Sequence, residues 1–143
     1  MEHDVRCLQN MRLMIVEGHA LVREGLLSLF WISGDVEALA VGAEDALRMA
    51  GQFLPDIVVL DMTLPAGAAL RIAESIVALR PTVKLLFLDD EINAGNVKAA
   101  LKLNAAGYWT KHASFEQIAE AVCTVAAGGM AFCPGVAEFF VLN

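Results

Sequence analysis

Three charged residues stand directly after three short segments that have the character of buried strands. Asp61 follows the apolar run 57–60, Glu17 follows the run 13–16, and Lys111 follows the segment 106–110. Continuous apolar runs of this length are typical of parallel strands covered on both faces. Open α/β sheets bind ligands at the carboxyl ends of their strands, so we expect the three side chains to meet there. Two acids and a lysine could then hold a cation and a phosphoryl group.

The amino-acid composition limits the class of protein to which such a site can belong. The chain has 143 residues, of which 57% are hydrophobic, so it can form one domain with a sizeable core. Its net charge is −7, and its Lys and Arg residues are scattered, which argues against direct binding of nucleic acid or a membrane surface. No apolar run reaches the length of a membrane span, and the polar residues 2–6 are unlike a signal peptide.

The cysteines predict the redox state of the protein. Cys7, Cys123 and Cys133 are odd in number and have no C-x-x-C spacing. This pattern favours reduced thiols over a disulfide framework, and it therefore predicts a cytoplasmic location.

Strand and helix signals alternate along the chain. Strands are predicted at residues 12–17, 36–41, 57–61, 83–88 and 107–110. Helices are predicted after the first strand, where Val22, Leu26, Leu29 and Phe30 share a face, and at residues 44–53, 68–80, 94–103 and 114–127. Five strand–helix units in succession predict an α/β fold with a doubly wound parallel sheet and right-handed crossovers.

The same signals divide the chain into three parts. Residues 1–11 are expected to form an N-terminal tail, residues 12–128 the domain, and residues 129–143 a C-terminal extension or the start of a linker. Phe30, Trp31 and Phe53 are expected in or near the core. His19 is expected to be a helix-start residue rather than a metal ligand, since no second His or Cys lies near it in sequence.

Three motifs, at residues 14–26, 55–65 and 105–111, together resemble the receiver domain of two-component response regulators. In the first helix, His19, Arg23, Gly25 and Leu26 are similar to the NarL/FixJ/LuxR subgroup, which usually carries a C-terminal helix-turn-helix output module. The resemblance covers about residues 12–134. It implies a flavodoxin-like (βα)5 fold with a five-stranded parallel sheet in the order 2-1-3-4-5.

The resemblance also implies roles for individual residues. Asp61 matches the phosphoacceptor, while Glu17, Asp61 and the backbone carbonyl of Thr63 match the Mg²⁺ ligands. Lys111, Thr63 and the residue at position 89, which is Asp89, match the phosphate-binding and switch positions. Such a domain is a regulatory phosphoacceptor and not an enzyme. Its expected partners are a sensor histidine kinase and a second copy in a homodimer, with DNA reached only through an output module absent from this chain.

Four residues depart from the pattern of the family. Gly18 stands where a second acid is usual, Asp89 where Ser or Thr is usual, Ala69 where Gly is usual and His112 where Pro is common. Loss of an acid predicts weak Mg²⁺ binding. A carboxylate at position 89 is expected to repel a phosphoryl group, or to hold Lys111 or a cation in the unphosphorylated pocket, so phosphorylation of Asp61 should be weak or short-lived.

Two functional interpretations therefore stay open. The chain is either a phosphorylatable receiver that controls a transcriptional output, or a degenerate receiver that acts as a phosphorylation-independent dimerisation or interaction module. A third interpretation, a flavodoxin-like binder of small molecules, is disfavoured, because residues 17–20 present an acid and lack a phosphate-binding loop rich in Gly, Ser or Thr.

Overall fold

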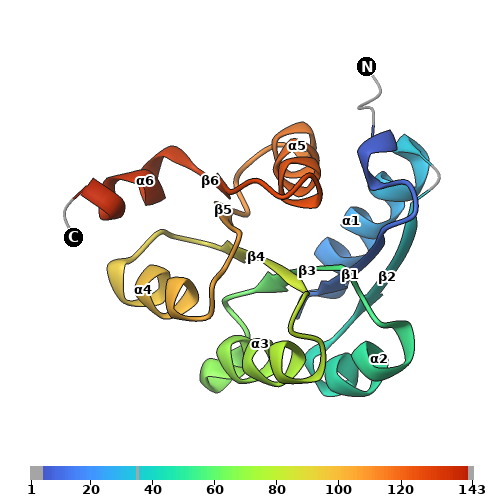
Figure 1. The fold of residues 1–143 in the computed structure, drawn as a ribbon, viewed down its shortest axis with the longest axis horizontal. Helices are drawn as coiled ribbons and strands as arrows, with labels where there is room; N and C mark the ends of the chain where they lie inside the picture. Colours follow the sequence, from blue (N-terminus) through green and yellow to red (C-terminus); the bar gives the residue numbers. More distant parts are fainter. Residues whose placement is uncertain (1–4, 35, 142–143) are drawn as a thin grey trace.

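A six-stranded parallel sheet forms the centre of the protein. The computed structural model describes residues 5–34 and 36–141. The strands are β1 (Arg12–Val16), β2 (Glu37–Val41), β3 (Ile57–Asp61), β4 (Lys84–Asp89), β5 (Gly107–Thr110) and β6 (Ala131–Phe132). Their order in the sheet is β2-β1-β3-β4-β5-β6 (Figure 1), which confirms the predicted order 2-1-3-4-5 and adds a short sixth strand that the sequence did not reveal.

Helices cover both faces of this sheet. They are α1 (Ala20–Ser33), α2 (Ala46–Phe53), α3 (Ala68–Leu79), α4 (Ala94–Lys102), α5 (Phe115–Ala126) and α6 (Pro134–Val141), with 3-10 turns η1 (Arg6–Leu8), η2 (Ala43–Asp45) and η3 (Pro65–Gly67). Figure 1 shows α1 and α5 on one face and α2, α3 and α4 on the other. Every residue of β3 is buried as a result, which explains its uninterrupted apolar run.

The parallel register aligns the strand ends that carry the charged residues. Val16 pairs with Leu60 between β1 and β3, and Asp61 pairs with Leu88 between β3 and β4. Asp89 pairs with Thr110, the last residue of β5. The residues that follow these strands therefore emerge at one edge of the sheet.

Local sequence signals set several helix ends. Ser114 and Gln117 form a capping box at the start of α5, in which each side chain bonds the backbone N–H of the other. Asn104, just after α4, has a φ of 59°, the left-handed conformation that Asn tolerates better than most residues.

Helix α1 turns its predicted apolar face towards α5: Leu26 packs against the core, and Val22 and Leu29 line a pocket with Phe115 and Ile118. Phe30 is buried and packs edge-to-face against Phe115 of α5, with ring centroids 5.0 Å apart. Trp31, expected in or near the core, is 55% exposed, so that expectation is wrong. Leu21 and Ile32 are also largely exposed, which gives α1 an apolar outer surface.

The N-terminal segment packs against the domain as far as the structure describes it. Val5 and Leu8 are buried in the same core cluster as residues of α5. Cys7 forms a disulfide with Cys123 of α5, with the two Cα atoms 5.6 Å apart, a normal separation for such a bond. The prediction that the thiols are reduced is therefore wrong for this pair, while Cys133 is free and buried. The domain boundaries proposed from the sequence stay predictions.

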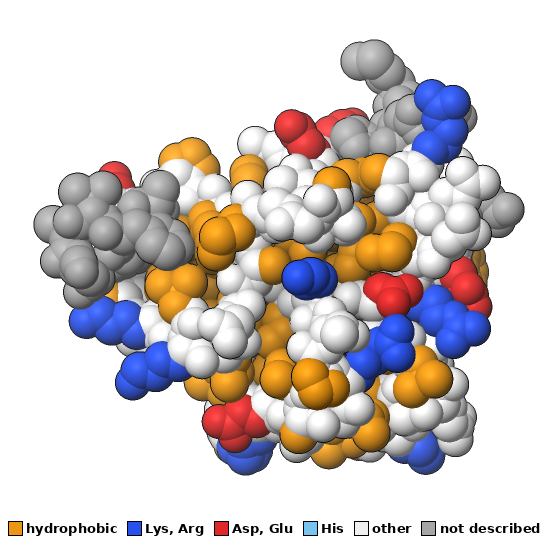
Figure 2. All heavy atoms as spheres, viewed as in Figure 1, with side chains coloured by type: hydrophobic (Ala, Val, Ile, Leu, Met, Phe, Trp, Pro, Cys, Tyr) orange, Lys and Arg blue, Asp and Glu red, His pale blue; other side chains and the backbone are white. Residues whose placement is uncertain are grey.

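The surface carries no concentrated charge on the face shown in Figure 2. Lys and Arg side chains there are spread among hydrophobic and acidic ones. None of the helices in the described residues is long and apolar enough to cross a membrane.

Reduction of the Cys7–Cys123 bond should lower the thermal stability of the protein. The bond joins residues separated by 116 positions, and cross-links of this kind typically contribute about 2–4 kcal/mol, largely by restricting the unfolded chain. For a domain of this size, that corresponds to a fall in Tm on the order of 10 °C. Calorimetry with and without a reductant measures it. Cys7→Ser is the control, because its Tm should not respond to reductant; equal Tm values for the wild type in both conditions would contradict the expectation.

Candidate functional site

Lys111 joins two buried carboxylates at the carboxyl edge of the sheet. Its Nζ lies 2.7 Å from Asp61 Oδ1 and 3.1 Å from Glu17 Oε1. The side chains of Asp61 and Glu17 are each 1% exposed, and that of Lys111 is 11% exposed. The structure thus brings together Asp61, the last residue of β3, with Glu17 and Lys111, the residues that follow β1 and β5. Water screens these charges little, so their mutual attraction is stronger than that of a surface pair.

Asp61 accepts hydrogen bonds on both carboxylate oxygens. Oδ1 accepts from the backbone N–H of Thr63 at 2.8 Å and from its hydroxyl at 2.6 Å, while Oδ2 accepts from the N–H of Gly18 at 3.1 Å. Burial alone would raise the pKa of Asp61, but the bonds from Lys111, Thr63 and Gly18 outweigh it and lower the pKa to about 2. Asp61 is therefore a carboxylate at neutral pH.

The same contacts act on Lys111. Burial would lower its pKa, but the Asp61 and Glu17 carboxylates outweigh this effect and raise the pKa above its ordinary value. The Nζ also donates to the Thr63 hydroxyl at 3.2 Å. Lys111 is thus a permanent cation placed against Asp61.

Glu17 extends the site towards the start of α1. Its Oε1 accepts from the backbone N–H of His19 at 3.1 Å and lies 3.2 Å from His19 Nδ1. Ligand atoms of Glu17, His19 and Asp61 lie within 4.8 Å of one another. Two carboxylates suit Mg²⁺, and the imidazole adds a nitrogen donor that transition metals use. His19 was not predicted as a metal ligand; its position two residues after Glu17, at a helix start, was the signal that could have included it.

Asp89 lies at the same edge but faces other partners. Its Oδ2 accepts from the Tyr108 hydroxyl at 2.5 Å and from Asn96 Nδ2 at 3.2 Å, and its Oδ1 accepts from the backbone N–H of Asp90 at 2.8 Å. Lys111 is not among the described donors to this side chain; it contacts Asp89 only through the backbone. The structure brings Glu17, Asp61, Thr63 and Lys111 together and turns the Asp89 carboxylate away from them.

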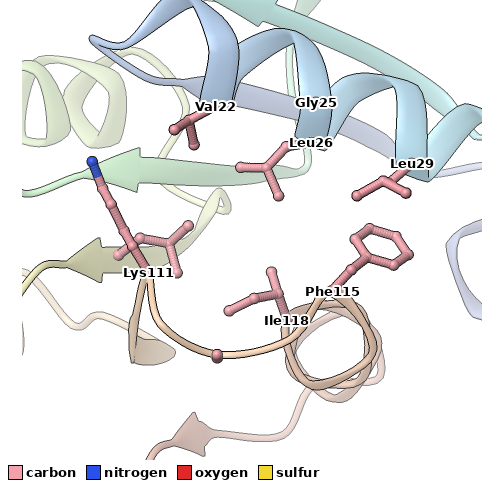
Figure 3. Close-up of a pocket in the computed structure, with 9 residues that line it drawn as sticks. Val22, Gly25, Leu26, Leu29, Lys111, Phe115 and Ile118 are labelled. Atoms are coloured by element: carbon pink, nitrogen blue, oxygen red, sulfur yellow. The ribbon is translucent and has the colours of Figure 1, made fainter.

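An apolar pocket of about 240 Å³ lies beside this charged cluster. Figure 3 shows Val22, Leu26 and Leu29 of α1 facing Phe115 and Ile118 of α5, with Lys111 at one end. The nitrogen of Lys111 points away from the apolar side chains, so only its aliphatic stem lines the pocket. The pocket therefore offers apolar surface and no free charge.

Comparison with known proteins identifies the family of the chain. A family model of the response regulator receiver domain matches residues 13–123. The chain belongs to this family. Receiver domains are phosphoacceptor modules and not enzymes.

Curated relatives of the receiver domain are transcriptional regulators. The chain is 31% identical over 125 residues to the transcriptional regulatory protein LnrK of Bacillus subtilis, covering 86% of this chain and 57% of that protein. It is 35% identical over 124 residues to the oxygen regulatory protein NreC of Staphylococcus carnosus, covering 82% of this chain and 56% of that protein. The chain spans little more than half the length of these relatives.

A solved structure supports the same family. A two-component response regulator of the LuxR family from Aurantimonas sp. SI85-9A1 superposes with a TM-score of 0.78 at 27% identity, covering 92% of this chain and 95% of that chain. The receiver domain of RcsB from Salmonella enterica, at 18% identity and a TM-score of 0.74, is similar in fold.

The ionised state of Asp61 should make stability depend on acid pH. Because its pKa is lowered to about 2 in the folded protein, its contribution is present above the unfolded pKa near 4 and is lost as pH falls towards 2. The contribution is on the order of 2 kcal/mol. Urea denaturation measures the free energy of unfolding of the wild type and of Asp61→Asn. The difference between the two should therefore become smaller as pH falls below about 5. The control is Asp90→Asn, which removes an exposed acid and should show little difference from the wild type at any of these pH values. A difference in the free energy of unfolding for Asp61→Asn that is independent of pH would argue against the assignment.

Gly18→Asp should strengthen Mg²⁺ binding several-fold, because it adds an anionic oxygen beside Asp61 and Glu17. A Cβ at position 18 would lie 3.1 Å from Leu64 Cδ2 and 3.4 Å from Asp61 Oδ2, so the leucine methyl must shift by a few tenths of an ångström. Gly18→Ala displaces the same leucine methyl but adds no carboxylate, so it is the matched control. Isothermal titration should give tighter binding for Gly18→Asp alone, and equal affinities for the two variants would refute this reasoning.

Proposed function

We propose that the chain is a receiver domain that accepts a phosphoryl group on Asp61 from a sensor histidine kinase. The observation that carries the proposal is the Lys111–Asp61 contact at 2.7 Å, which sets a permanent cation against an ionised nucleophile. Thr63 supplies two further donors to the same carboxylate oxygen. Phosphoryl transfer depends mainly on positioning and neutralisation of charge, and these groups supply both.

The proposed reaction is a direct transfer. A carboxylate oxygen of Asp61 forms a bond to phosphorus, and the bond from phosphorus to the donor nitrogen breaks, with its electron pair leaving on the imidazole of the kinase. Oδ1 is held by Lys111 and by both donors of Thr63, whereas Oδ2 has the Gly18 N–H as its described donor. Oδ2 is therefore the less encumbered oxygen for attack. Lys111 and the Thr63 hydroxyl then remain beside the acyl phosphate that forms.

A divalent cation is part of this proposal. Glu17, Asp61 and the backbone carbonyl of Thr63 would hold Mg²⁺, with His19 as a further donor for other metals. Bound there, the cation would neutralise charge on the phosphoryl oxygens. The protein residues position Asp61 and exclude water from its carboxylate.

The output of the domain is proposed from its relatives. The curated proteins it resembles are described as transcriptional or oxygen regulatory proteins, so we place this domain in control of transcription. A cytoplasmic location is proposed from this role alone, because the Cys7–Cys123 disulfide removes the argument from reduced thiols. Contact with DNA would run through an output module outside this chain, since the Lys and Arg residues form no basic cluster on the face seen in Figure 2. The exposed Leu21, Trp31 and Ile32 of α1 support protein association, including a homodimer.

One observation favours a second candidate, a receiver that acts without phosphorylation. The residue at position 89 is a carboxylate bound to Tyr108 and Asn96 instead of a hydroxyl that could donate to a phosphoryl group. In this case the domain would be a constitutive dimerisation or interaction module.

Phosphorylation of Asp61 is tested by intact-mass measurement after incubation with acetyl phosphate and Mg²⁺. We expect an adduct of one phosphoryl group in low yield for the wild type, none for Asp61→Asn, and an unchanged yield for the control Asp90→Asn, which removes an exposed neighbouring acid. The double variant Gly18→Asp, Asp89→Thr should raise the yield, because it restores an acid for the cation and a hydroxyl donor. No adduct in the wild type or the double variant would refute the phosphoacceptor proposal, and a full adduct in the wild type would refute the second candidate.

A further inference from the structure

The Asp89 carboxylate connects three elements through hydrogen bonds. It ends β4, is nearly fully buried, and accepts from Tyr108 on β5, from Asn96 on α4 and from the backbone of Asp90. A charged carboxylate has two oxygens that accept several bonds at once, whereas a serine or threonine hydroxyl has one oxygen and a single proton. The residue at position 89 can therefore hold both neighbours at the same time.

Tyr108 is held on both its side chain and its backbone. Its ring is buried and lies 6.1 Å from that of Phe87, and its hydroxyl donates to Asp89 at 2.5 Å. Burial and the Asp89 charge raise its pKa, so the hydroxyl keeps its proton at neutral pH. The backbone carbonyl of Tyr108 accepts from the N–H of Cys133 at 3.1 Å, immediately before α6. The bond to Asp89 is thus linked to the start of α6 through one residue.

Asn96 makes the corresponding link to α4. It lies in the first turn of the helix, where its backbone N–H donates to the capping side chain of Asn93 at 2.8 Å. Its side-chain amide donates to Asp89 at 3.2 Å. Val97 and Ala100 of α4 are buried in one core cluster with Tyr108 and with Val136 of α6. Helices α4 and α6 are in contact, so whatever fixes α4 and β5 also fixes the surface on which α6 packs.

We propose that Asp89, Tyr108 and Asn96 form a clamp that seats α6 on α4 and β5 without phosphorylation of Asp61. Lys111, Glu17, Asp61 and Thr63 form their own contacts and share no side-chain bond with the clamp among the described residues. The clamp is therefore complete while Asp61 is a free carboxylate. The clamp holds the C-terminal helix α6 in one position. A partner that recognises α4 and α6 therefore meets the same surface whether or not Asp61 is phosphorylated.

Hydrogen exchange without any phosphodonor tests the clamp. Tyr108→Phe removes one hydroxyl, and Asn96→Ala removes the other side-chain donor at a half-buried position where Ala favours the helix. Both should speed exchange in residues 134–141 by roughly tenfold, the effect of losing one hydrogen bond to a charged group. Thr124→Val removes a hydroxyl from α5 and should leave this segment unchanged. Residues 46–79, on α2, β3 and α3, serve as an internal reference.

Three outcomes would overturn the clamp. The first is an exchange rate over residues 134–141 that stays at the wild-type value in both Tyr108→Phe and Asn96→Ala. The second is an equal increase in exchange over residues 46–79, which would mean global destabilisation. A change over residues 134–141 in the wild type on adding acetyl phosphate and Mg²⁺ would also refute it, because the clamp would then depend on Asp61. Failure to detect any phosphoryl adduct refutes the phosphoacceptor proposal alone, since the clamp is measured without a donor.

Discussion

The Lys111–Asp61 ion pair is the interaction on which the carboxyl edge of the sheet depends. Asp61 is the last residue of β3 and Lys111 follows β5, and β4 lies between these strands, so the lysine side chain must reach past the end of β4. An unpaired charge buried at this depth would cost several kcal/mol. Glu17 and the Thr63 hydroxyl complete the coordination of the ammonium group. With two carboxylates and one ammonium, the trio carries a net charge of about −1, which favours a cation.

The two unusual residues of the site act on this charge in different ways. Gly18 lies beside Asp61 and gives it a backbone donor where a second acid is usual, so it makes the charged site less negative. Asp89 would have made the pocket more negative, but its carboxylate is bonded to Tyr108 and Asn96 instead. The site around Lys111 therefore carries less negative charge than the number of acids in the nearby sequence indicates. The Asp89 side chain, which was expected to repel a phosphoryl group, instead holds α4 and β5 together.

The two faces of the sheet are stabilised by different means. On the face of α2, α3 and α4, a large buried cluster extends to Val136 of α6. On the face of α1 and α5, the core includes Val5 and Leu8 of the N-terminal segment, and a disulfide ties Cys7 to α5. The outer side of α1 remains apolar and exposed, next to the pocket between α1 and α5. The residues available for association and those that hold the C-terminal helix thus lie on opposite faces.

The sequence by itself determined the features that depend on neighbours along the chain. The apolar run of β3, the capping box at Ser114 and the left-handed Asn104 are local. The positions of Glu17, Asp61 and Lys111 at strand ends predicted their meeting, while the strand order came from the resemblance to receiver domains. A two-residue strand such as β6 is too short for any periodic pattern. The exposure of Trp31 was missed because α1 also carries large apolar residues outside its predicted face, and their size alone does not show which of them are buried.

Only the tertiary structure decided the pairings between distant residues. Asp89 and Tyr108 are separated by 19 positions, and Cys7 and Cys123 by 116. A carboxylate beside a phosphoryl site can face either the site or its neighbours, and the choice depends on which donors the adjoining strand and helix present. Those donors, the Tyr108 hydroxyl and the Asn96 amide, reach Asp89 only after β4, α4 and β5 have packed together, because hydrogen-bond partners are set by positions in space rather than along the chain.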